Sequence, residues 1–175
     1  MDDVLVSLSR KIRDVIDFPQ KGIVFKDITT LLKEPSAFKM TIDKLAKSFQ
    51  EVPLDLVVGM ESRGFILGAP LAYSLGAGFV PVRKVGKLPA EAIKADYALE
   101  YGTATLEMHV DAIQRGQKVL IVDDLLATGG TAVATIGMVE RLGGEVIGVA
   151  FLIELAFLNG RKRLEGHNVV SLITY

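Results

Sequence analysis

The chain has 175 residues, half of them apolar, and its 20 basic and 21 acidic side chains leave a formal net charge of −1. That length and composition predict one domain with a full apolar core, and the balanced charge argues against a duplex-binding surface. Cysteine is absent, no apolar run is long enough to cross a bilayer, and the acidic start at Met1–Asp3 does not resemble a signal peptide. We therefore expect a cytoplasmic protein that contacts neither a membrane nor nucleic acid.

The N-terminal third predicts two amphipathic helices joined by a polar segment. Apolar residues recur at helical spacing over 4–17, and Phe18-Pro19 ends that helix because the residue before a proline avoids the α region. A second apolar stripe predicts a helix over 35–49. Between the two helices Phe25 stands among charged residues, and taken alone it is better explained as a core residue than as part of a site.

The middle of the chain follows the order strand, small polar loop, helix, strand. A strand over Leu54–Met60 leads through Glu61–Gly64 into a helix over Phe65–Leu75, and Gly78–Val85 forms the next strand. The next segment, 90–110, alternates in polarity. It predicts two short antiparallel strands that leave the main sheet and form a candidate lid.

Basic residues gather where these strands end. Arg63 could bind a phosphate group through two parallel hydrogen bonds, and Arg83, Lys84 and Lys87 add three further cations. Cations at a strand end are usually solvated, but parallel strands present their carboxyl ends at the same edge of a sheet, so these side chains are expected to converge. Ser62 is one residue out of register for the G-x-S-x-G nucleophile elbow, which makes a hydrolase a weak alternative.

The most informative stretch is Val119–Thr131, V-L-I-V-D-D-L-L-A-T-G-G-T. Four apolar residues predict a strand buried on both faces, and helical spacing resumes after Gly130. The first N–H groups of that helix have no intrahelical acceptor, so this turn can receive a phosphate. Asp123 and Asp124 stand a few residues earlier, where carboxylate oxygens suit hydroxyl groups. The stretch predicts a pocket for ribose 5-phosphate.

A purely structural role or a different nucleotide motif accounts less well for this stretch. A solvated strand end followed by an ordinary turn would explain a glycine pair that occurs alone. Here a buried strand, an acid pair and T-G-G-T follow one another directly, and this combination is far more specific than a glycine pair. No lysine follows Gly130, so the chain has no Walker A loop there, and G-x-G-x-x-G does not occur.

The C-terminal part predicts a strand over Glu145–Ile153, a short basic and solvated helix over Asn159–Leu164, and a last strand over Asn168–Thr174. The alternation of strands and helices predicts an α/β fold with a mainly parallel twisted sheet and helices on both faces.

The stretch V-D-D-L-L-A-T-G-G-T resembles the phosphoribosyl-pyrophosphate (PRPP) motif of the type I phosphoribosyltransferases. Further segments, in order along essentially the full chain, resemble the adenine-specific branch of that family. They are G-I-V-F-K-D-I (22–28), E-S-R-G-F (61–65), R-K-V-G-K-L-P (83–89) and L-E-Y-G (99–102). Lys26 and Glu61 look like charge-conserving replacements of arginine and aspartate in some relatives.

The resemblance implies transfer of the 5-phosphoribosyl group from PRPP to adenine, giving AMP and pyrophosphate in purine salvage. It implies Mg²⁺ held mainly through PRPP and pyrophosphate rather than by a protein metal site. It also implies a homodimer with Arg83–Leu88 near the interface, a small hood over about 18–34 and a flexible lid over about 90–108 within a single domain. A strained or cis peptide is expected at Glu61–Ser62.

The same resemblance assigns roles to individual residues. Asp123 and Asp124 would hold the ribose 2′ and 3′ hydroxyls, Phe25 would stack on the purine with Leu155 on its opposite face, and Glu100 would act as the acid or base on the lid. The 5′-phosphate would lie among Ala127, Thr128, Gly129, Gly130 and Thr131. The remaining expected substrate contacts are Val24, Lys26, Glu61, Ser62, Arg63, Lys84, Lys87 and Tyr101, with Arg63 also expected to be catalytic.

Two alternative functions remain open at this point. A phosphoribosyltransferase for hypoxanthine, guanine or xanthine would carry the same PRPP half, although E-S-R-G-F and the short hood favour adenine. A PRPP-sensing regulator would need a DNA-binding domain, for which the chain has neither spare length nor a basic face.

Overall fold

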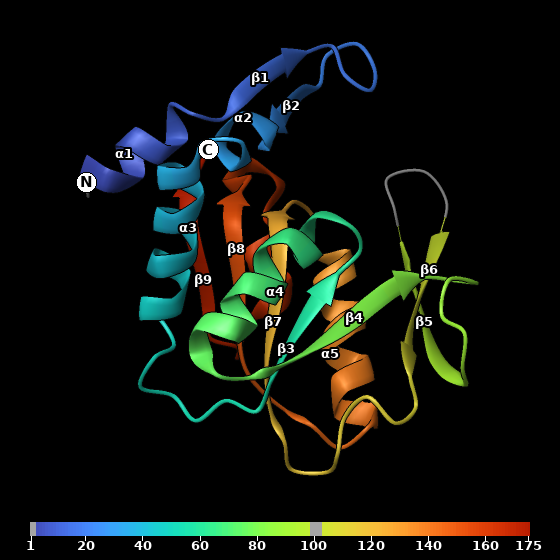
Figure 1. Cartoon of the computed structure of the whole chain (residues 1–175). Helices are drawn as coiled ribbons and strands as arrows, with labels where there is room; N and C mark the ends of the chain where they lie inside the picture. Colours follow the sequence, from blue (N-terminus) through green and yellow to red (C-terminus); the bar gives the residue numbers. More distant parts are fainter. Residues whose placement is uncertain (1–2, 99–102) are drawn as a thin grey trace. The chain divides into compact units, whose positions relative to one another are not determined.

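The computed structural model describes residues 3–98 and 103–175, which form two compact units divided after Lys44. The first unit contains three helices and a small antiparallel sheet (Figure 1). In chain order its elements are α1 (Asp3–Ser9), β1 (Arg13–Ile16), β2 (Val24–Asp27), α2 (Thr29–Leu32) and most of α3 (Pro35–Lys47).

The helix predicted over 4–17 is wrong in its second half. The chain leaves the helix after Ser9, and β1 pairs antiparallel with β2, with Ile16 opposite Val24. The adjacent β-branched side chains of Val15 and Ile16 favour a strand. Pairing with β2 also gives hydrogen-bond partners to backbone N–H and C=O groups that would have none at the end of a short isolated helix. The apolar spacing of 4–17 contained no information about this partner strand. The second predicted helix is confirmed as α3, which ends two residues earlier than expected.

The second unit is built on a seven-stranded sheet in the order β5-β6-β4-β3-β7-β8-β9. Neighbours from β4 to β9 run parallel, whereas β6 is antiparallel to both β4 and β5. The strands are β3 (Leu56–Met60), β4 (Gly78–Lys84), β5 (Ala92–Ala98), β6 (Thr103–His109), β7 (Lys118–Leu126), β8 (Glu145–Glu154) and β9 (Val169–Thr174). The predicted α/β fold and the antiparallel pair are confirmed, but the pair does not leave the main sheet: β6 pairs with β4, so β5 and β6 extend the sheet at one edge. The expected turn of that hairpin lies outside the described residues.

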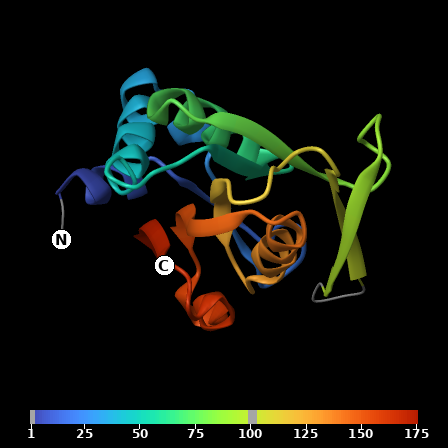
Figure 2. The ribbon, with the colours of Figure 1, turned by 90° about the horizontal axis from the view of Figure 1, so that it is seen from below.

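Two helices cover the sheet, α4 (Arg63–Leu75) and α5 (Gly130–Arg141). After β3 the chain crosses through α4 to β4, and after β7 it crosses through α5 to β8 on the other side. Right-handed crossovers in opposite directions place the two helices on opposite faces, and Figures 1 and 2 show α4 and α5 on either side of the sheet. The direction of winding changes between β3 and β7, and in open α/β sheets ligands bind at the carboxyl ends of the strands at such a point.

The two short 3₁₀ turns η1 (Ala156–Leu158) and η2 (Gly160–Leu164) connect β8 to β9. The predicted helix over Asn159–Leu164 is therefore a tighter turn, and its first and last residues, Gly160 and Leu164, are buried rather than solvated. Within residues 3–98 and 103–175, no helix has both the length and the apolar character that crossing a bilayer requires.

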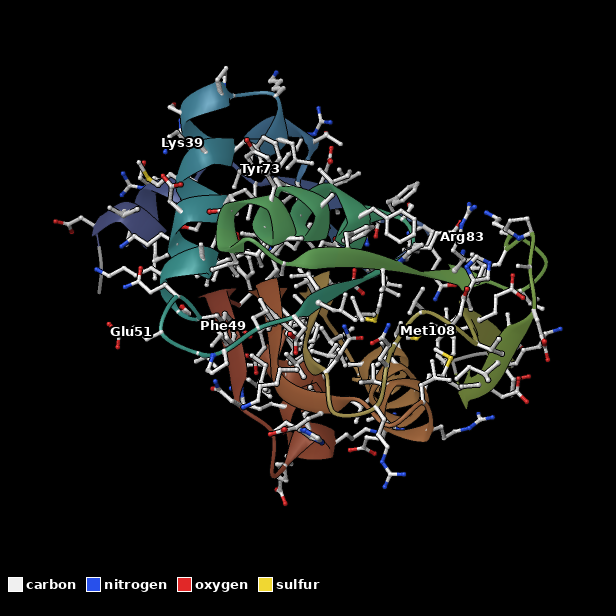
Figure 3. All side chains as sticks on the ribbon, turned by 60° about the horizontal axis from the view of Figure 1, so that its bottom comes forward. Lys39, Phe49, Glu51, Tyr73, Arg83 and Met108 are labelled. Atoms are coloured by element: carbon white, nitrogen blue, oxygen red, sulfur yellow. The ribbon has the colours of Figure 1, made fainter. Side chains whose placement is uncertain are left out.

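Phe49 follows α3 and is 1% exposed against the sheet of the second unit (Figure 3). A Cβ on Gly148 of β8 would lie 2.6 Å from its ring and 3.3 Å from the Asn168 carbonyl oxygen. We predict that Gly148→Ala lowers the free energy of unfolding by about 1–3 kcal/mol, because an enclosed ring has no room to move away. Urea denaturation measures this change.

The matched control is Gly137→Ala, in the interior of α5, where a Cβ meets no atom within 4 Å. This variant should be neutral or stabilised by up to about 1 kcal/mol, since alanine is the better helix former. Equal stability of the two variants would contradict the proposed close packing of Phe49 on Gly148.

Candidate functional site

The acid pair and the small-residue loop lie at the carboxyl end of β7. The strand is longer than predicted: it continues through Asp123 and Asp124, with Asp123 opposite Phe151 and Leu126 opposite Glu154 on β8. The pairing with β8 therefore places the backbone of Asp123 in the ladder, near the carboxyl end of β7. Gly129 then turns the chain with φ +81° and serves as the N-cap of α5.

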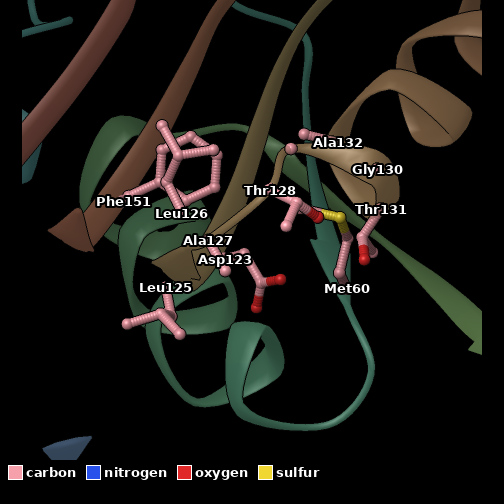
Figure 4. A pocket seen from close by; sticks show the side chains of 11 residues that line it. Met60, Asp123, Leu125, Leu126, Ala127, Thr128, Gly130, Thr131, Ala132 and Phe151 are labelled. Carbon is pink, nitrogen blue, oxygen red and sulfur yellow. The ribbon is translucent and has the colours of Figure 1, made fainter. Parts of the chain in front are cut away.

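The loop encloses a cavity of about 60 Å³ (Figure 4). Because Gly129 has no side chain with which to cap α5, the first N–H groups of the helix remain available to an anion. The lining residues are Met60, Asp123, Leu125, Leu126, Ala127, Thr128, Gly129, Gly130, Thr131, Ala132 and Phe151. The sequence predicted the polar members; Met60 and Phe151 are brought in from the neighbouring strands β3 and β8.

Arg63, the first residue of α4, pairs with the acid residues of β7. Its Nε lies 2.8 Å from Asp124 Oδ2. The two elements approach closely because the next residue is glycine: a Cβ on Gly64 would lie 2.8 Å from the Val122 carbonyl oxygen and 3.0 Å from Asp123 Oδ1. The structure thus joins the E-S-R-G and V-D-D segments, which are about 60 residues apart in the sequence.

Asp123 and Asp124 share a site that disfavours two negative charges. Burial and the adjacent Asp124 carboxylate raise the pKa of Asp123 well above its usual range. Burial also raises the pKa of Asp124, although Arg63 opposes that shift. Strongly shifted carboxyl groups beside a cavity are typical of functional sites.

The predicted cationic cluster is organised by Glu61, whose side chain is 8% exposed. Glu61 accepts hydrogen bonds from Lys87 Nζ at 2.5 Å, the Lys84 N–H at 3.0 Å and Arg83 Nε at 3.3 Å. Burial opposes ionisation of Glu61, but the bonds from Lys87 and Lys84, with the Arg83 charge, outweigh it and hold the pKa of this carboxyl below its usual range. The expected cis peptide at Glu61–Ser62 is confirmed.

Glu107 on β6 is a residue that the sequence analysis missed. Its Oε1 accepts the backbone N–H groups of Lys87 and Leu88 at 2.8 and 2.9 Å. The hydrogen bond from the Leu88 N–H does most to lower the pKa of Glu107. Burial opposes this lowering, whereas hydrogen bonds from the N–H groups of Gly86 and Lys87 and the positive charge of Lys94 contribute to it. The alternating pattern of 90–110 could have placed Glu107 on a strand, but only the antiparallel register with β4 brings it to this turn.

The model for the family described as "Phosphoribosyl transferase domain" matches residues 27–172 of the chain. The chain belongs to this family. It is 59% identical over 170 residues to the adenine phosphoribosyltransferase of Alkaliphilus metalliredigens, covering 97% of this chain and 100% of that protein.

Solved structures of similar proteins support the fold. The adenine phosphoribosyltransferase of Thermoanaerobacter pseudethanolicus superposes with a TM-score of 0.95 at 56% identity, covering 98% of this chain and 99% of the other. The enzyme of Saccharomyces cerevisiae, complexed with D-2,5-dideoxy-2,5-imino-altritol 1,6-bisphosphate and adenine, superposes with a TM-score of 0.92 at 42% identity over 98% of this chain and 99% of that one.

The structure describes some of the remaining site residues predicted for this phosphoribosyltransferase. Leu155 donates its N–H to the Leu126 carbonyl at 2.9 Å, so it is a direct neighbour of the cavity wall. Ser62 precedes α4 at the carboxyl end of β3. Glu100 and Tyr101 lie outside the described residues.

The expected base contacts Val24, Phe25 and Lys26 lie on β2 of the first unit. Phe25 is half-buried rather than a core residue, and its ring packs edge-on against Phe18 with the centroids 5.2 Å apart. Lys26 forms an ion pair with Asp14 across the two-stranded sheet at 2.7 Å.

The phosphoribosyltransferase site also bears on how a metal would be held. Among residues 3–98 and 103–175, no three His, Asp or Glu side chains are grouped so that they could hold an ion. Two adjacent carboxylates on one strand supply too few oxygens for the six-ligand shell of Mg²⁺, which binds readily through substrate phosphates and retained waters instead. The residues present fit a magnesium ion that arrives with PRPP.

We predict that Asp123→Asn stabilises this phosphoribosyltransferase at pH 7. The pKa of Asp123 in the folded chain lies above its value of about 3.9 in the unfolded chain. Ionising Asp123 therefore lowers the free energy of unfolding at pH values above about 3.9, and this loss of stability disappears when the pH falls below that value. The amide oxygen can still accept the Asp124 N–H bond, which is 2.8 Å long.

Thermal unfolding between pH 3.5 and 8 measures this effect. The Tm difference between Asp123→Asn and the unmodified chain should grow with pH and vanish near pH 3.5. Asp111→Asn, an exposed carboxylate outside the site, serves as the control and should show no such trend. A lower Tm for Asp123→Asn throughout this range would contradict the prediction.

Proposed function

We propose that this chain transfers the 5-phosphoribosyl group of PRPP to adenine, forming AMP and releasing pyrophosphate. The observation that carries the proposal is the cavity after β7, which is lined by Asp123 and by the residues at the N-terminus of α5, with Asp124 held beside it in an ion pair with Arg63. Support comes from the adenine phosphoribosyltransferases to which nearly the whole chain is similar, one of them in complex with adenine.

In this reaction the ribose is held at both ends. The N–H groups after Gly129 and the Thr128 and Thr131 hydroxyls bind the 5′-phosphate, while Asp123 and Asp124 accept hydrogen bonds from the 2′ and 3′ hydroxyls. Fixing the sugar in this way holds C1′ in line between the purine and the departing group. The bond from C1′ to the pyrophosphate oxygen breaks, that oxygen keeps the electron pair, and C1′ bonds to the purine nitrogen.

Lys84 and Lys87 stabilise the pyrophosphate as it departs. In the structure Lys87 is paired with Glu61, so pyrophosphate competes with an internal carboxylate for this cation. Glu61 therefore contributes by orienting the side chains of Arg83 and Lys87, in addition to the substrate contact proposed for it.

Arg63 has five donor N–H groups, so its pair with Asp124 through Nε is compatible with a catalytic contact to pyrophosphate through its terminal nitrogens. A bound Mg²⁺ would be held mainly by the oxygens of PRPP and pyrophosphate and would neutralise part of the leaving-group charge.

Phe25 is proposed to stack on the purine, with Val24 and Lys26 beside it as parts of a hood over about 18–34. Leu155 is proposed as a further purine contact. The lid over about 90–108 excludes water, which would otherwise hydrolyse PRPP. Tyr101 on the lid and Ser62 beside α4 complete the proposed substrate contacts. We propose a single functional domain that acts as a homodimer in the cytoplasm; light scattering that gives a monomer mass would contradict the dimer.

The test of the function is AMP formation from adenine and PRPP, measured with and without Mg²⁺. We expect magnesium-dependent turnover and a clear preference for adenine when hypoxanthine, guanine and xanthine compete in the same assay. Preference for an oxopurine would assign the chain to another base. Tight PRPP binding without turnover of any base would favour a PRPP-sensing regulator.

We predict that Glu100→Gln lowers kcat on the order of 100-fold with little change in the KM for PRPP. The proton on the purine nitrogen must leave as the new bond forms, and general acid–base groups typically contribute about 10²–10⁴-fold. The matched control is Glu51→Gln, an exposed carboxylate outside the proposed lid and site, which should keep the original kcat. Unchanged turnover in Glu100→Gln would remove this residue from the mechanism.

A further inference from the structure

The turn η2 lies directly behind the phosphate-binding loop, with backbone against backbone. A Cβ on Gly160 would lie 2.1 Å from the Ala127 carbonyl oxygen and 3.0 Å from the Gly129 nitrogen. In the opposite direction, a Cβ on Gly129 would lie 2.8 Å from the Gly160 carbonyl oxygen. These neighbours are main-chain atoms that no rotamer change can move, so any side chain at Gly160 must displace the loop itself.

The position of Gly160 is set by the residue after it. The guanidinium of Arg161 donates from Nε to Glu154 Oε1 at 3.0 Å and also bonds Glu154 Oε2 through a terminal nitrogen. The same side chain donates to the Val169 carbonyl at 2.9 Å and to Ser171 Oγ at 3.1 Å. One side chain therefore ties η2 to the end of β8 and to β9.

The Arg161–Glu154 pair is suited to act as a rigid support. Glu154 is 6% exposed at the end of β8, opposite Leu126 of β7. The hydrogen bonds from Arg161 lower the pKa of Glu154 although its burial opposes the shift, so the pair stays charged at neutral pH. Fork-shaped pairs of this kind add geometric definition as well as energy.

We propose that Gly160 and Arg161 are positioning residues for the 5′-phosphate of the ribose, a role that rests on the proposed function of the neighbouring loop. Neither residue touches the cavity; they act by fixing the carbonyl of Ala127 and thereby the direction of the N–H groups that follow it. A Cβ on Gly160 would lie 2.1 Å from the Ala127 carbonyl oxygen, whereas ordinary contacts of a Cβ are longer than 3.0 Å. The loop would therefore have to move by about one ångström to accept it. Displacements of that size in a substrate-holding group reduce rates on the order of 100-fold.

The test compares AMP with adenosine, because the two ligands differ only in the phosphate. Calorimetry or ligand-observed NMR gives the affinity of each for the unmodified chain and for Gly160→Ala. We expect Gly160→Ala to weaken AMP binding at least tenfold and adenosine binding less than twofold. Gly137→Ala, which adds the same methyl group where no atom lies within 4 Å, should change neither affinity.

A second variant covers the case in which Gly160→Ala does not fold. Arg161→Gln removes the charged fork and leaves Gly160 in place, so it should also weaken AMP more than adenosine. Arg161→Lys, which restores the charge but offers a single nitrogen, should recover only part of the loss.

Two results would overturn the proposal: AMP affinity within twofold of the original in a folded Gly160→Ala or Arg161→Gln variant, or an equal loss for AMP and adenosine. Failure of the proposed function looks different, because the unmodified chain would then bind AMP no more tightly than adenosine.

Discussion

The ion pair between Arg63 and Asp124 connects the two halves of the sheet at the place where its winding changes direction. Arg63 begins α4 after β3, and Asp124 lies near the end of β7, so one contact of 2.8 Å joins two strand–loop–helix units. It forms only because Gly64 lets α4 approach the β7 backbone. The carboxylates proposed to bind the sugar and the cationic residues proposed for pyrophosphate are brought to one edge by this junction.

A common principle governs the charged groups around this edge. Asp124 is paired with Arg63, Lys87 with Glu61, and Arg161 with Glu154. Isolated buried charges would destabilise the fold strongly, and pairing within the chain reduces that penalty. Asp123 is the exception, since its nearest charged neighbour is another carboxylate. A group that destabilises the fold at neutral pH is expected where function requires its charge.

Glycine acts in two distinct ways in this site. Gly129 takes a left-handed backbone conformation that turns the chain into α5. Gly64 and Gly160 instead leave room for another segment of backbone, Gly64 for β7 and Gly160 for the loop between β7 and α5. The first kind can be suspected from a T-G-G-T motif, whereas the second depends on which segment lies opposite.

The amino-acid sequence by itself determined most of the order of the elements, the mainly parallel α/β class and the composition of the loop proposed to bind phosphate. These depend on local signals: apolar runs, the chemistry of a helix N-terminus, and acid residues a few positions away. Tertiary structure alone decided that residues 13–16 form a strand, that Glu61 pairs with the side chains of Arg83 and Lys87, and that Glu107 and Gly160 support the loops. Those outcomes arise from contacts between segments tens of residues apart, and a pattern of hydrophobic spacing does not specify which segments meet.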